Sequence, residues 1–394
     1  MSNYLLRSSD NRATMTGMIP RKLEDNIRNS LNRGRIIIVY GPRRIGKTTL
    51  VRKILSEAPK AEQLYLNCDE IQTRQDLTPY SLSSLERAVG SAKMIVIDEA
   101  QRVENIGLTL KILIDAHPEL NIIATGSSSF DLANKIKEPL TGRSIELHLT
   151  PLSLTEIKDH FGYHPRQLEG VYEKLMRYGS YPSVFEMTPQ QAERELLTIA
   201  SQYVYKDTLE LVEIRQQQLL PRLLQALALQ IGNEVSYHEL GILLGAKLET
   251  VARYITLLEQ SFIIYRLPAL TGNQRSQLSN RKRKVYFYDL GVRNALINNF
   301  NKLSLRDDVG ALWESLCVSE RRKLHLSNQD FVDMYYWRGV YGEVDMIESQ
   351  GGKWRAFECK WNEDKFKVPK YFREKFPDIE VELLNQKTLP QFID

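Results

Sequence analysis

Short apolar runs alternate with segments of helical spacing through residues 1–150. The runs are a few residues long and rich in β-branched side chains, which is typical of strands that are buried on both faces. Strand and helix in alternation predict a parallel sheet covered by helices, with ligands at the carboxyl ends of the strands. The expected strands are Ile36–Tyr40, Gln63–Cys68, Met94–Ile97, Asn121–Thr125 and Ser144–Leu149.

Downstream of this sheet the pattern becomes mainly helical. Residues 151–216 carry helical patterns that are interrupted at Tyr178–Pro182. An apolar helix at Leu219–Ile231, a second at Tyr237–Leu244 and a third after the turn at Gly245 predict a winged helix. The third helix is marked by apolar residues at helical spacing, namely Val251, Tyr254, Ile255, Leu258 and Phe262.

The C-terminal part has a different order of elements. Lys284–Asp289 has the pattern of a strand, and the helix Val309–Leu324 precedes three strands, a further helix and a last strand. Strand alternation places Glu358 and Lys360 on one face. The three strands after the helix are Phe331–Arg338, Glu343–Glu348 and Lys353–Trp361, and a turn at Gln350–Gly352 joins the last two.

The segment Gly41–Thr49 has the spacing G-x-x-x-x-G-K-T of a phosphate-binding P-loop, with a strand before it and a helix after it. Gly41 and Gly46 allow successive backbone N–H groups to face the phosphates, and the helix N-terminus adds its positive dipole end. Lys47 would contact the β- and γ-phosphates, and the Thr48 hydroxyl would bind Mg²⁺. The predicted nucleotide-binding residues are Gly41, Pro42, Arg43, Arg44, Ile45, Gly46, Lys47, Thr48 and Thr49.

A pair of carboxylates, Asp98 and Glu99, ends the buried strand that begins at Met94. Such a pair at a strand end occurs in ordinary turns, but downstream of a P-loop it indicates an NTPase. Asp98 would hold the metal through water or through Thr48, and Glu99 would orient and deprotonate the attacking water.

Four segments, GPRRIGKTT, MIVIDEAQ, TGSSS and LTGRSIELHLTPLSLTE, together resemble a family of prokaryotic AAA+-related ATPases that is often called archaeal-type. The resemblance covers nearly the whole chain and implies an α/β fold, with ATP and Mg²⁺ as cofactors. It divides the chain into an AAA+-like P-loop ATPase domain at 1–150, a helical lid at 151–216, a winged-helix domain with a basic linker at 217–284, and a restriction-endonuclease-like domain at 285–394.

The resemblance to AAA+ ATPases also suggests two catalytic positions. Ser127, with Ser128 as the alternative, would lie beside the γ-phosphate as sensor 1; a serine-rich turn that caps the next helix is the other interpretation. Arg143 would reach the nucleotide of a neighbouring subunit as an arginine finger, which implies a homo-oligomer. The alternative for Arg143 is a solvated arginine at a helix C-terminus.

Two groups of side chains are candidates for contact with DNA. Lys247, Thr250 and Arg253 would lie on the exposed face of the third helix, although Glu249 and Glu259 reduce its positive charge. Winged helices also serve as protein interfaces. A basic cluster that could contact phosphates, or be a solvated loop, follows at Arg281, Lys282, Arg283 and Lys284.

Asp345, followed after a hairpin by Glu358-Cys359-Lys360, resembles the signature of the restriction-endonuclease-like fold. Asp345 and Glu358, together with Glu314 from the preceding helix, would bind one or two divalent cations. The metal would lower the pKa of a bound water, and Lys360 would orient the hydroxide. Domains with this signature also bind DNA without cutting it, so cleavage and binding both stay open.

Composition adds few limits to these interpretations. The chain has 394 residues, 42% of them hydrophobic and 26% charged, as expected for two or three globular domains. A formal net charge of +4 permits nucleic-acid binding without requiring it. Cys68, Cys317 and Cys359 are too dispersed for a zinc site and are typical of a reducing compartment. With no leader or spanning run expected, the chain is predicted to be cytoplasmic and free of the membrane.

The sequence therefore predicts an oligomeric, Mg²⁺-dependent ATPase whose cycle acts on DNA, including branched or broken DNA. One alternative is a signalling NTPase, in which ATP binding switches protein partners without any action on DNA. Another is a metal-dependent deoxyribonuclease that uses ATP only for assembly.

Overall fold

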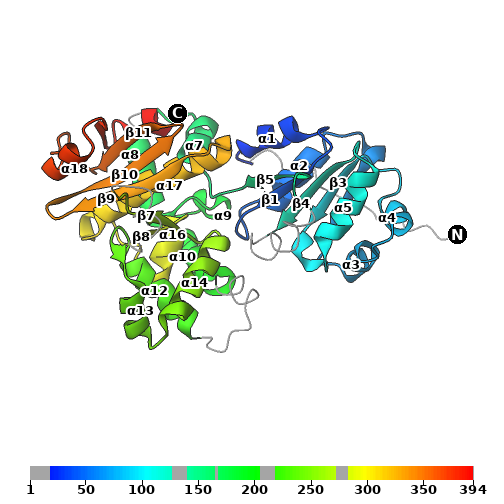
Figure 1. Cartoon of the computed structure of the whole chain (residues 1–394), viewed down its shortest axis with the longest axis horizontal. Coiled ribbons are helices and arrows are strands. Elements are labelled where there is room, and N and C mark those ends of the chain that lie inside the picture. The colour runs from blue at the N-terminus through cyan, green and yellow to red at the C-terminus, as the bar shows by residue number, and fades with distance from the viewer. Residues whose placement is uncertain (1–17, 127–139, 165–166, 205–217, 272–282, 394) are drawn as a thin grey trace.

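The computed structural model describes residues 18–126, 140–164, 167–204, 218–271 and 283–393 (Figure 1). The N-terminal part, blue to cyan in Figure 1, lies on one side of the molecule, and the green-to-red remainder lies on the other. Ser127, Ser128, Arg281 and Lys282 lie outside the described residues, so their predicted roles remain predictions.

The N-terminal part contains a five-stranded sheet in the order β2-β3-β4-β1-β5, and each neighbouring pair is parallel. All five expected strands are present, which confirms the predicted α/β sheet. Its strands are β1 (Ile36–Tyr40), β2 (Gln63–Asn67), β3 (Met94–Asp98), β4 (Asn121–Gly126) and β5 (Ser144–His148). The helices around it are α1 (Leu23–Ser30), α2 (Lys47–Leu55), α3 (Ile71–Leu77), α4 (Leu82–Val89) and α5 (Ile106–Ala116).

Side-chain alternation along the strands builds a separate core on each face of this sheet. Ile37 and Val39 of β1 pack with residues of α1 and α2, whereas Ile36 and Ile38 pack with residues of α3, α4 and α5. All five residues of β1 are buried, as are all five of β3. Because both faces of β1 and β3 are packed, the positions of their carboxyl ends are fixed. The P-loop follows one of these ends and the Asp98-Glu99 pair lies at the other.

The helices that follow do not form the separate lid expected at 151–216. Leu154 and Leu175 share a buried core with Trp313 and Phe357 of the C-terminal part. Leu196 instead packs in the core that contains the helices from residue 219 onward. The helices are α7 (Leu154–Phe161), α8 (Leu168–Tyr178), α9 (Pro182–Phe185) and α10 (Pro189–Thr198), followed by a π-helical segment at Ile199–Val204.

The next unit combines three helices with a small antiparallel sheet in the order β6-β8-β7. β8 is its central strand, so the expected domain boundary after residue 284 cuts through a strand and is wrong. The elements are α12 (Leu219–Leu229), β6 (Glu234–Val235), α13 (Tyr237–Leu244), α14 (Leu248–Gln260), β7 (Ile264–Pro268) and β8 (Arg283–Phe287), with α16 (Leu290–Leu296) after them.

The C-terminal part has the predicted order of helix, three strands, helix and strand. Its sheet runs β12-β11-β10-β9, with β12 parallel to β11 and the other pairs antiparallel. Phe357 and Cys359 face the core that includes Trp313 of the long helix, while Ala356 packs in a smaller cluster with Phe372. The elements are α17 (Val309–Asn328), β9 (Asp333–Gly339), β10 (Gly342–Gln350), β11 (Lys353–Cys359), α18 (Lys370–Lys375), β12 (Val381–Leu384) and α19 (Leu389–Ile393).

None of the helices in the described part of the chain combines the length and the apolar character that a bilayer span requires.

A largely buried histidine, His148, lies where β5 meets the second half of the chain. The ring of His148 stacks on Tyr40, with centroids 5.7 Å apart, and meets the edge of Phe262 at 5.3 Å. Burial, together with the positive charge of Arg322, lowers the pKa of His148 to about 4. The folded chain therefore holds this imidazole neutral at pH values where the unfolded chain would protonate it.

Replacing this ring tests the linkage between burial and pH. His148 contributes stability that is complete above its unfolded pKa of about 6.5 and is lost as the pH falls toward 4. From pH 7 to about pH 4.5 this loss is about 2 to 3 kcal/mol of unfolding free energy. His148→Phe keeps an aromatic ring and removes the titration, so urea unfolding should show a smaller acid loss in the variant. Equal losses in the two proteins would contradict the buried neutral state.

Candidate functional site

The P-loop connects β1 to α2, and both of its glycines are required by the backbone geometry. A Cβ at Gly41 would overlap the carbonyl oxygen of Leu149, so no larger residue fits against the end of β5. Gly46 has a φ of +94° and forms the N-cap of α2, a conformation that L side chains rarely adopt. The loop therefore lies directly over the N-terminus of α2, where a phosphate is stabilised.

The ammonium group of Lys47 lies inside the loop. It donates hydrogen bonds to the carbonyl oxygens of Gly41 at 2.8 Å and Pro42 at 3.0 Å, and the residue is 5% exposed. These contacts place a buried positive charge beside the backbone N–H groups of the loop. An anionic phosphate is the ligand that such an arrangement favours.

Asp98 is a hydrogen-bond acceptor for three hydroxyl groups at the carboxyl edge of the sheet. Its carboxylate accepts from Thr48 Oγ1 at 2.7 Å, from the Tyr65 hydroxyl at 2.5 Å and from Thr125 Oγ1. The side chain is almost fully buried, so these hydroxyls fix the position of its oxygens. A hydroxyl beside a buried carboxylate is a donor set that suits Mg²⁺, and Thr48 with Asp98 would hold the ion here.

Glu99 is held in an uncommon backbone conformation. Its φ is +54°, which is costly for a residue with a Cβ and points to a site where the side chain must be aimed. The Glu99 N–H donates to Thr125 Oγ1 at 3.1 Å, and its Oε2 accepts from Gln101 Nε2 at 2.5 Å. Thr125 therefore fixes both acidic residues, one through the side chain and one through the backbone.

An open pocket of about 600 Å³ lies in front of these groups. Arg102 of the wall pairs with Asp69 at 2.7 Å, and Arg44 pairs with Glu195 of α10. Four cationic and two acidic side chains line the pocket, so its formal charge is positive, which suits a polyphosphate. The lining residues are Arg43, Arg44, Gly46, Lys47, Thr48, Thr49, Asp69, Glu99, Arg102 and Ser183.

Several residues of this site were not predicted from the sequence. Tyr65 and Thr125 come from β2 and β4, the strands on either side of β3. Gln101 and Arg102 lie two and three residues after Glu99, and this closeness in sequence to the carboxylates was the one available signal. The contact of Tyr65 with Asp98 depends on the strand order, which the sequence does not reveal.

Arg143 lies at the opposite edge of the sheet from the P-loop. Its carbonyl oxygen accepts from the N–H of Ile36, the first residue of β1, whereas the P-loop follows the last residue of that strand. Its guanidinium pairs with Asp115 at 2.5 Å. A five-residue strand spans about 17 Å, so Arg143 is too far away to contact the nucleotide of its own subunit. A finger acting on a neighbouring subunit remains a prediction.

The C-terminal part contains a second cluster of charged residues, around a buried lysine. Glu314 of α17 and Glu343 and Asp345 of β10 have carboxylate oxygens within 4.8 Å of one another. Lys284 of β8 donates to Glu314 at 2.8 Å and pairs with Glu343, and it is fully buried. Tyr286 from the same strand also donates to Glu314, at 2.5 Å. One ammonium group thus lies among three carboxylates and offsets part of their negative charge.

This arrangement corrects two expectations. Lys284 was expected to contact DNA phosphates, but it is buried among carboxylates. The expected metal set of Glu314, Asp345 and Glu358 does not gather as such, because Glu358 pairs with Lys360 at 2.9 Å instead. Asp345 accepts the N–H of Cys359 at 2.8 Å. Lys284 and the Cys359 N–H therefore already occupy carboxylate oxygens that a divalent cation would need in this cluster.

Glu314 of this cluster and Glu358, which neighbours Asp345, hold their protons more strongly than usual. Burial raises the pKa of Glu314 to about 7 against the opposing effect of Lys284. Burial and the neighbouring Asp345 raise the pKa of Glu358 to about 7 as well. Both groups are therefore partly protonated near neutral pH, which weakens them further as metal ligands.

The other predicted DNA-contacting residues lie near the start of α14. Lys247 and Arg253 are exposed, and Thr250 is half-buried. Arg283 is half-buried at the start of β8. These positions leave Lys247 and Arg253 accessible to a partner.

Three family models match successive parts of the chain. The first, described as an AAA domain, covers residues 33–158. Two others, described as domains of unknown function DUF8612 and DUF4143, cover residues 169–303 and 309–389. The P-loop part is therefore similar to AAA domains. The second match extends past β8 and α16, in agreement with the place of β8 in the three-stranded sheet.

Two relatives match most of the chain. An uncharacterized protein of Mycobacterium tuberculosis is 25% identical over 340 residues, which span 85% of this chain and 72% of the relative. An uncharacterized protein of Methanocaldococcus jannaschii is 23% identical over 382 residues, which span 90% of this chain and 82% of the relative. Among solved structures, the Walker-type ATPase of Pyrococcus abyssi has a TM-score of 0.47 at 16% identity and covers 71% of this chain and 96% of that chain.

The buried lysine gives a direct test of the second cluster. Lys284→Met keeps the length of the side chain and removes its charge, which leaves Glu314 without its cation and Glu343 with Arg338 alone. Removing one member of a buried ion pair costs about 3 to 5 kcal/mol of unfolding free energy. Urea unfolding without nucleotide should show this loss, whereas adding Mn²⁺ should leave the stability of the wild-type protein unchanged. Stabilisation of the wild type by Mn²⁺ that Glu314→Gln abolishes would contradict this interpretation.

Proposed function

We propose that the chain hydrolyses ATP with Mg²⁺ and uses the cycle to act on DNA as an oligomer. The hydroxyl network around Asp98, beside Lys47 and Glu99, is the observation that carries the hydrolytic part. At one edge of one sheet, Lys47 supplies a cation for the phosphates, Thr48 and Asp98 supply a metal-binding pair, and Glu99 supplies a carboxylate base.

Each group has a distinct task in this proposal. Lys47 would leave the P-loop carbonyls for the β- and γ-phosphates, and Thr48 with Asp98 would hold a Mg²⁺ ion, which would supply positive charge to the phosphate oxygens. The Glu99 carboxylate accepts a proton from water as the water attacks the γ-phosphorus. Gln101 holds Glu99 until substrate and water are in place, through the hydrogen bond of 2.5 Å.

A second pocket, of about 220 Å³, adjoins the phosphate pocket and supports a site for the base. The two pockets share Gly46 and Thr49, and the second is lined by apolar residues that include Ile19 and Leu50. A purine ring fits such a narrow and largely apolar wall. Adenine as the base rests on the resemblance to AAA+ ATPases.

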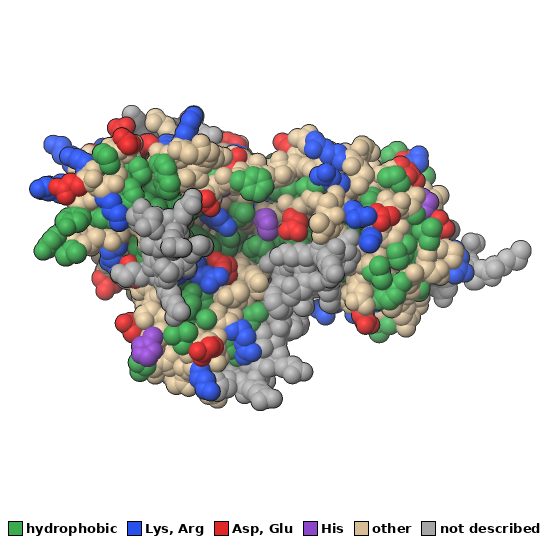
Figure 2. All heavy atoms as spheres, viewed as in Figure 1, with side chains coloured by type: hydrophobic (Ala, Val, Ile, Leu, Met, Phe, Trp, Pro, Cys, Tyr) green, Lys and Arg blue, Asp and Glu red, His purple; other side chains and the backbone are tan. Residues whose placement is uncertain are grey.

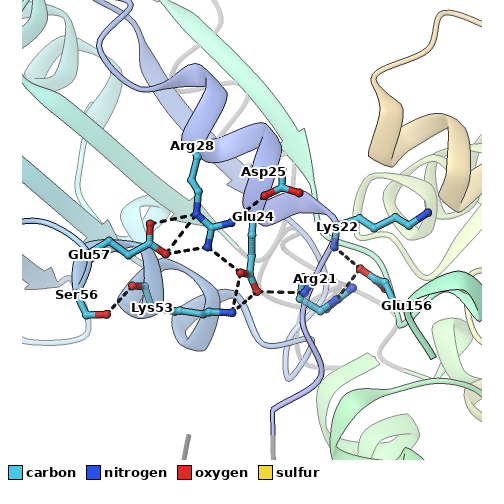
Figure 3. A network of polar contacts seen from close by, with 9 residues as sticks. All are labelled: Arg21, Lys22, Glu24, Asp25, Arg28, Lys53, Ser56, Glu57 and Glu156. Carbon is cyan, nitrogen blue, oxygen red and sulfur yellow. Dashed lines mark hydrogen bonds and ion pairs between the residues drawn. The ribbon is translucent and has the colours of Figure 1, made fainter. Parts of the chain in front are cut away.

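Figure 3 shows the polar network behind this pocket, around Arg21 and Glu24. The Arg21 guanidinium donates to Glu156 of α7 at 3.1 Å (Figure 3). It also donates to the carbonyl oxygens of Ile45 at 3.1 Å and Thr150 at 2.6 Å. One side chain thus joins the P-loop backbone to a helix that packs with the C-terminal part. Movement of the P-loop on nucleotide binding would be transmitted through this contact.

A second connection runs from the phosphate pocket to the helices after residue 182. Ser183 lines that pocket, and Arg44 of the P-loop pairs with Glu195 of α10. Arg44 has a φ of +61°, so its side chain is directed by a strained backbone. We propose that the γ-phosphate competes with Glu195 for Arg44, and that this competition couples hydrolysis to the rest of the chain.

DNA is proposed as the partner on two grounds. The order of helices and the β6-β8-β7 sheet supports a winged helix, and Lys247 and Arg253 are exposed at the helix that would approach a groove. No role in metal-dependent cleavage is assigned to the C-terminal part, because Lys284 fills the acidic cluster. The nuclease-like fold would then bind DNA without cutting it.

A switch that controls protein partners is the second candidate. Leu229, Ile242 and Leu243 are 64%, 72% and 59% exposed, on α12 and α13. Apolar side chains exposed together indicate a protein interface.

ATP turnover measured with single-stranded, duplex and four-way DNA separates the two candidate functions. Stimulation by any of them supports action on DNA, and turnover indifferent to all of them favours the switch.

Glu99→Gln tests the base. The amide cannot accept the proton of the attacking water, so kcat for ATP should fall by about 100-fold or more. Binding of Mg·ATP, measured with a fluorescent analogue, should stay within a few-fold of the wild type. Glu104→Gln, an acid a few residues downstream that lies outside the pocket, is the matched control. Normal turnover in Glu99→Gln would exclude Glu99 as the base.

Arg143→Ala tests the oligomer. Loss of a trans-acting finger lowers kcat by about 1,000-fold or more without weakening nucleotide binding. Mixing Arg143→Ala with inactive Lys47→Ala subunits should restore part of the activity, because some interfaces then combine an intact P-loop with an intact Arg143. The control Arg87→Ala should remain active. An Arg143→Ala protein as active as this control would refute the finger.

A further inference from the structure

The segment from Lys365 to Lys375 carries an unusual concentration of exposed positive charge. It contains five exposed cations and a single carboxylate, Glu374. Lys370 has a side chain that is 89% exposed and lies 3.6 Å from Glu374, so even this pair is in water. The cations are Lys365, Lys367, Lys370, Arg373 and Lys375. Ion pairs this exposed hold their partners weakly, so the positive charge is available to a ligand.

Exposed aromatic side chains border this segment. Tyr371 at the start of α18 is 59% exposed, and Tyr341 in the turn between β9 and β10 is 86% exposed, next to Val340 at 81%. The turn and the segment are in contact, because a Cβ added at Gly342 would lie 2.7 Å from Pro369. Figure 2 shows Lys and Arg side chains beside hydrophobic ones at this end of the molecule, over α18 and the β9–β10 turn of Figure 1.

The fold holds these side chains outward. Phe372 is fully buried, and its ring meets Trp337 of β9 at 5.2 Å and Phe376 at 5.2 Å. This anchor fixes α18 on the sheet, so the neighbouring Tyr371 and Arg373 face solvent. Arg338 of β9, which pairs with Glu343 at 2.9 Å, lies near the same turn and is 40% exposed. We name the surface formed by Lys365, Lys367, Lys370, Tyr371, Arg373 and Tyr341 the basic-aromatic surface.

We propose that the basic-aromatic surface binds single-stranded nucleic acid. Lysines and arginine at its edge would contact phosphates, while the two tyrosine rings offer faces on which bases stack. A single strand offers both its phosphates and the faces of its bases, whereas a duplex offers its phosphates but keeps the base faces stacked inside. A bilayer fits less well, because the apolar side chains here are few and lie between charges. The inference rests on the proposed function in taking DNA as the partner.

The test measures binding of a fluorescein-labelled oligothymidylate by anisotropy at several salt concentrations. The triple variant Lys365→Ala, Lys367→Ala, Lys370→Ala should bind at least tenfold more weakly. Its slope of log K against log salt should be smaller by about 2, since each phosphate contact on a single strand contributes about 0.7. The matched triple Lys60→Ala, Lys302→Ala, Lys353→Ala removes as many exposed lysines elsewhere and should bind as the wild type does.

A second variant separates stacking from charge. Tyr341→Ala with Tyr371→Ala should weaken binding about tenfold or more while leaving the salt slope unchanged. Equal affinities in the first triple and its matched control would overturn the proposal. So would a first triple that loses affinity for phosphatidylserine vesicles and keeps its affinity for the oligonucleotide.

Binding of single strands at the basic-aromatic surface and ATP turnover can be tested separately. The first triple should retain the ATP turnover measured without DNA, because none of its positions lies in the nucleotide pocket. Lys47→Ala should retain oligonucleotide binding while losing turnover. A wild-type protein that binds the oligonucleotide at this surface but shows no turnover would contradict the proposed ATPase and leave the surface in place.

Discussion

The nucleotide site depends on one buried carboxylate. Asp98 ends a strand buried on both faces, and a charged group in that position is stable because three hydroxyls donate to it. The hydroxyls come from α2, β2 and β4, so the carboxylate also locks three elements into one register. Any metal held by Thr48 and Asp98 is therefore placed by the sheet itself, and the P-loop is placed by the same sheet two strands away.

The rest of the chain is tied to that site by a few charged side chains. Arg21 joins the P-loop carbonyl of Ile45 to α7, and Arg44 joins the loop to α10. α7 shares its core with the C-terminal sheet, while α10 packs with the helices that precede the small sheet. Each arginine thus connects the P-loop to a different part of the molecule. This is the physical basis on which we propose that the nucleotide state is transmitted to a partner.

The local parts of the fold and site were predictable from the sequence. Buried strands and the glycine spacing are short-range patterns, so the five strands, the P-loop and the Asp98-Glu99 pair follow from neighbouring residues alone. Tyr65 and Thr125 could not be found in this way, because they meet Asp98 through strand order. Phe287 at the end of β8 illustrates the same limit, since its pairing with Ile264 of β7 spans the whole segment between them.

Charge was the least predictable property. Lys284 lies at the end of a basic run, and in sequence it resembles its solvated neighbours. Only its place in the central strand of the small sheet directs it toward Glu314 and Glu343. The same contact changes the interpretation of Asp345 and Glu358, whose spacing predicted a metal site. A motif of carboxylates defines possible ligands, whereas the neighbouring cations decide whether a metal can compete.

The most direct test of the central claim is calorimetric titration of ATP, with and without Mg²⁺, into the wild type and Asp98→Asn. The wild type should bind Mg·ATP more than about tenfold more tightly than metal-free ATP, since the ion adds its bonds to Thr48 and Asp98. Asp98→Asn should lose this preference and bind metal-free ATP as the wild type does. An Asp98→Asn protein that keeps the full preference for Mg·ATP would contradict the account.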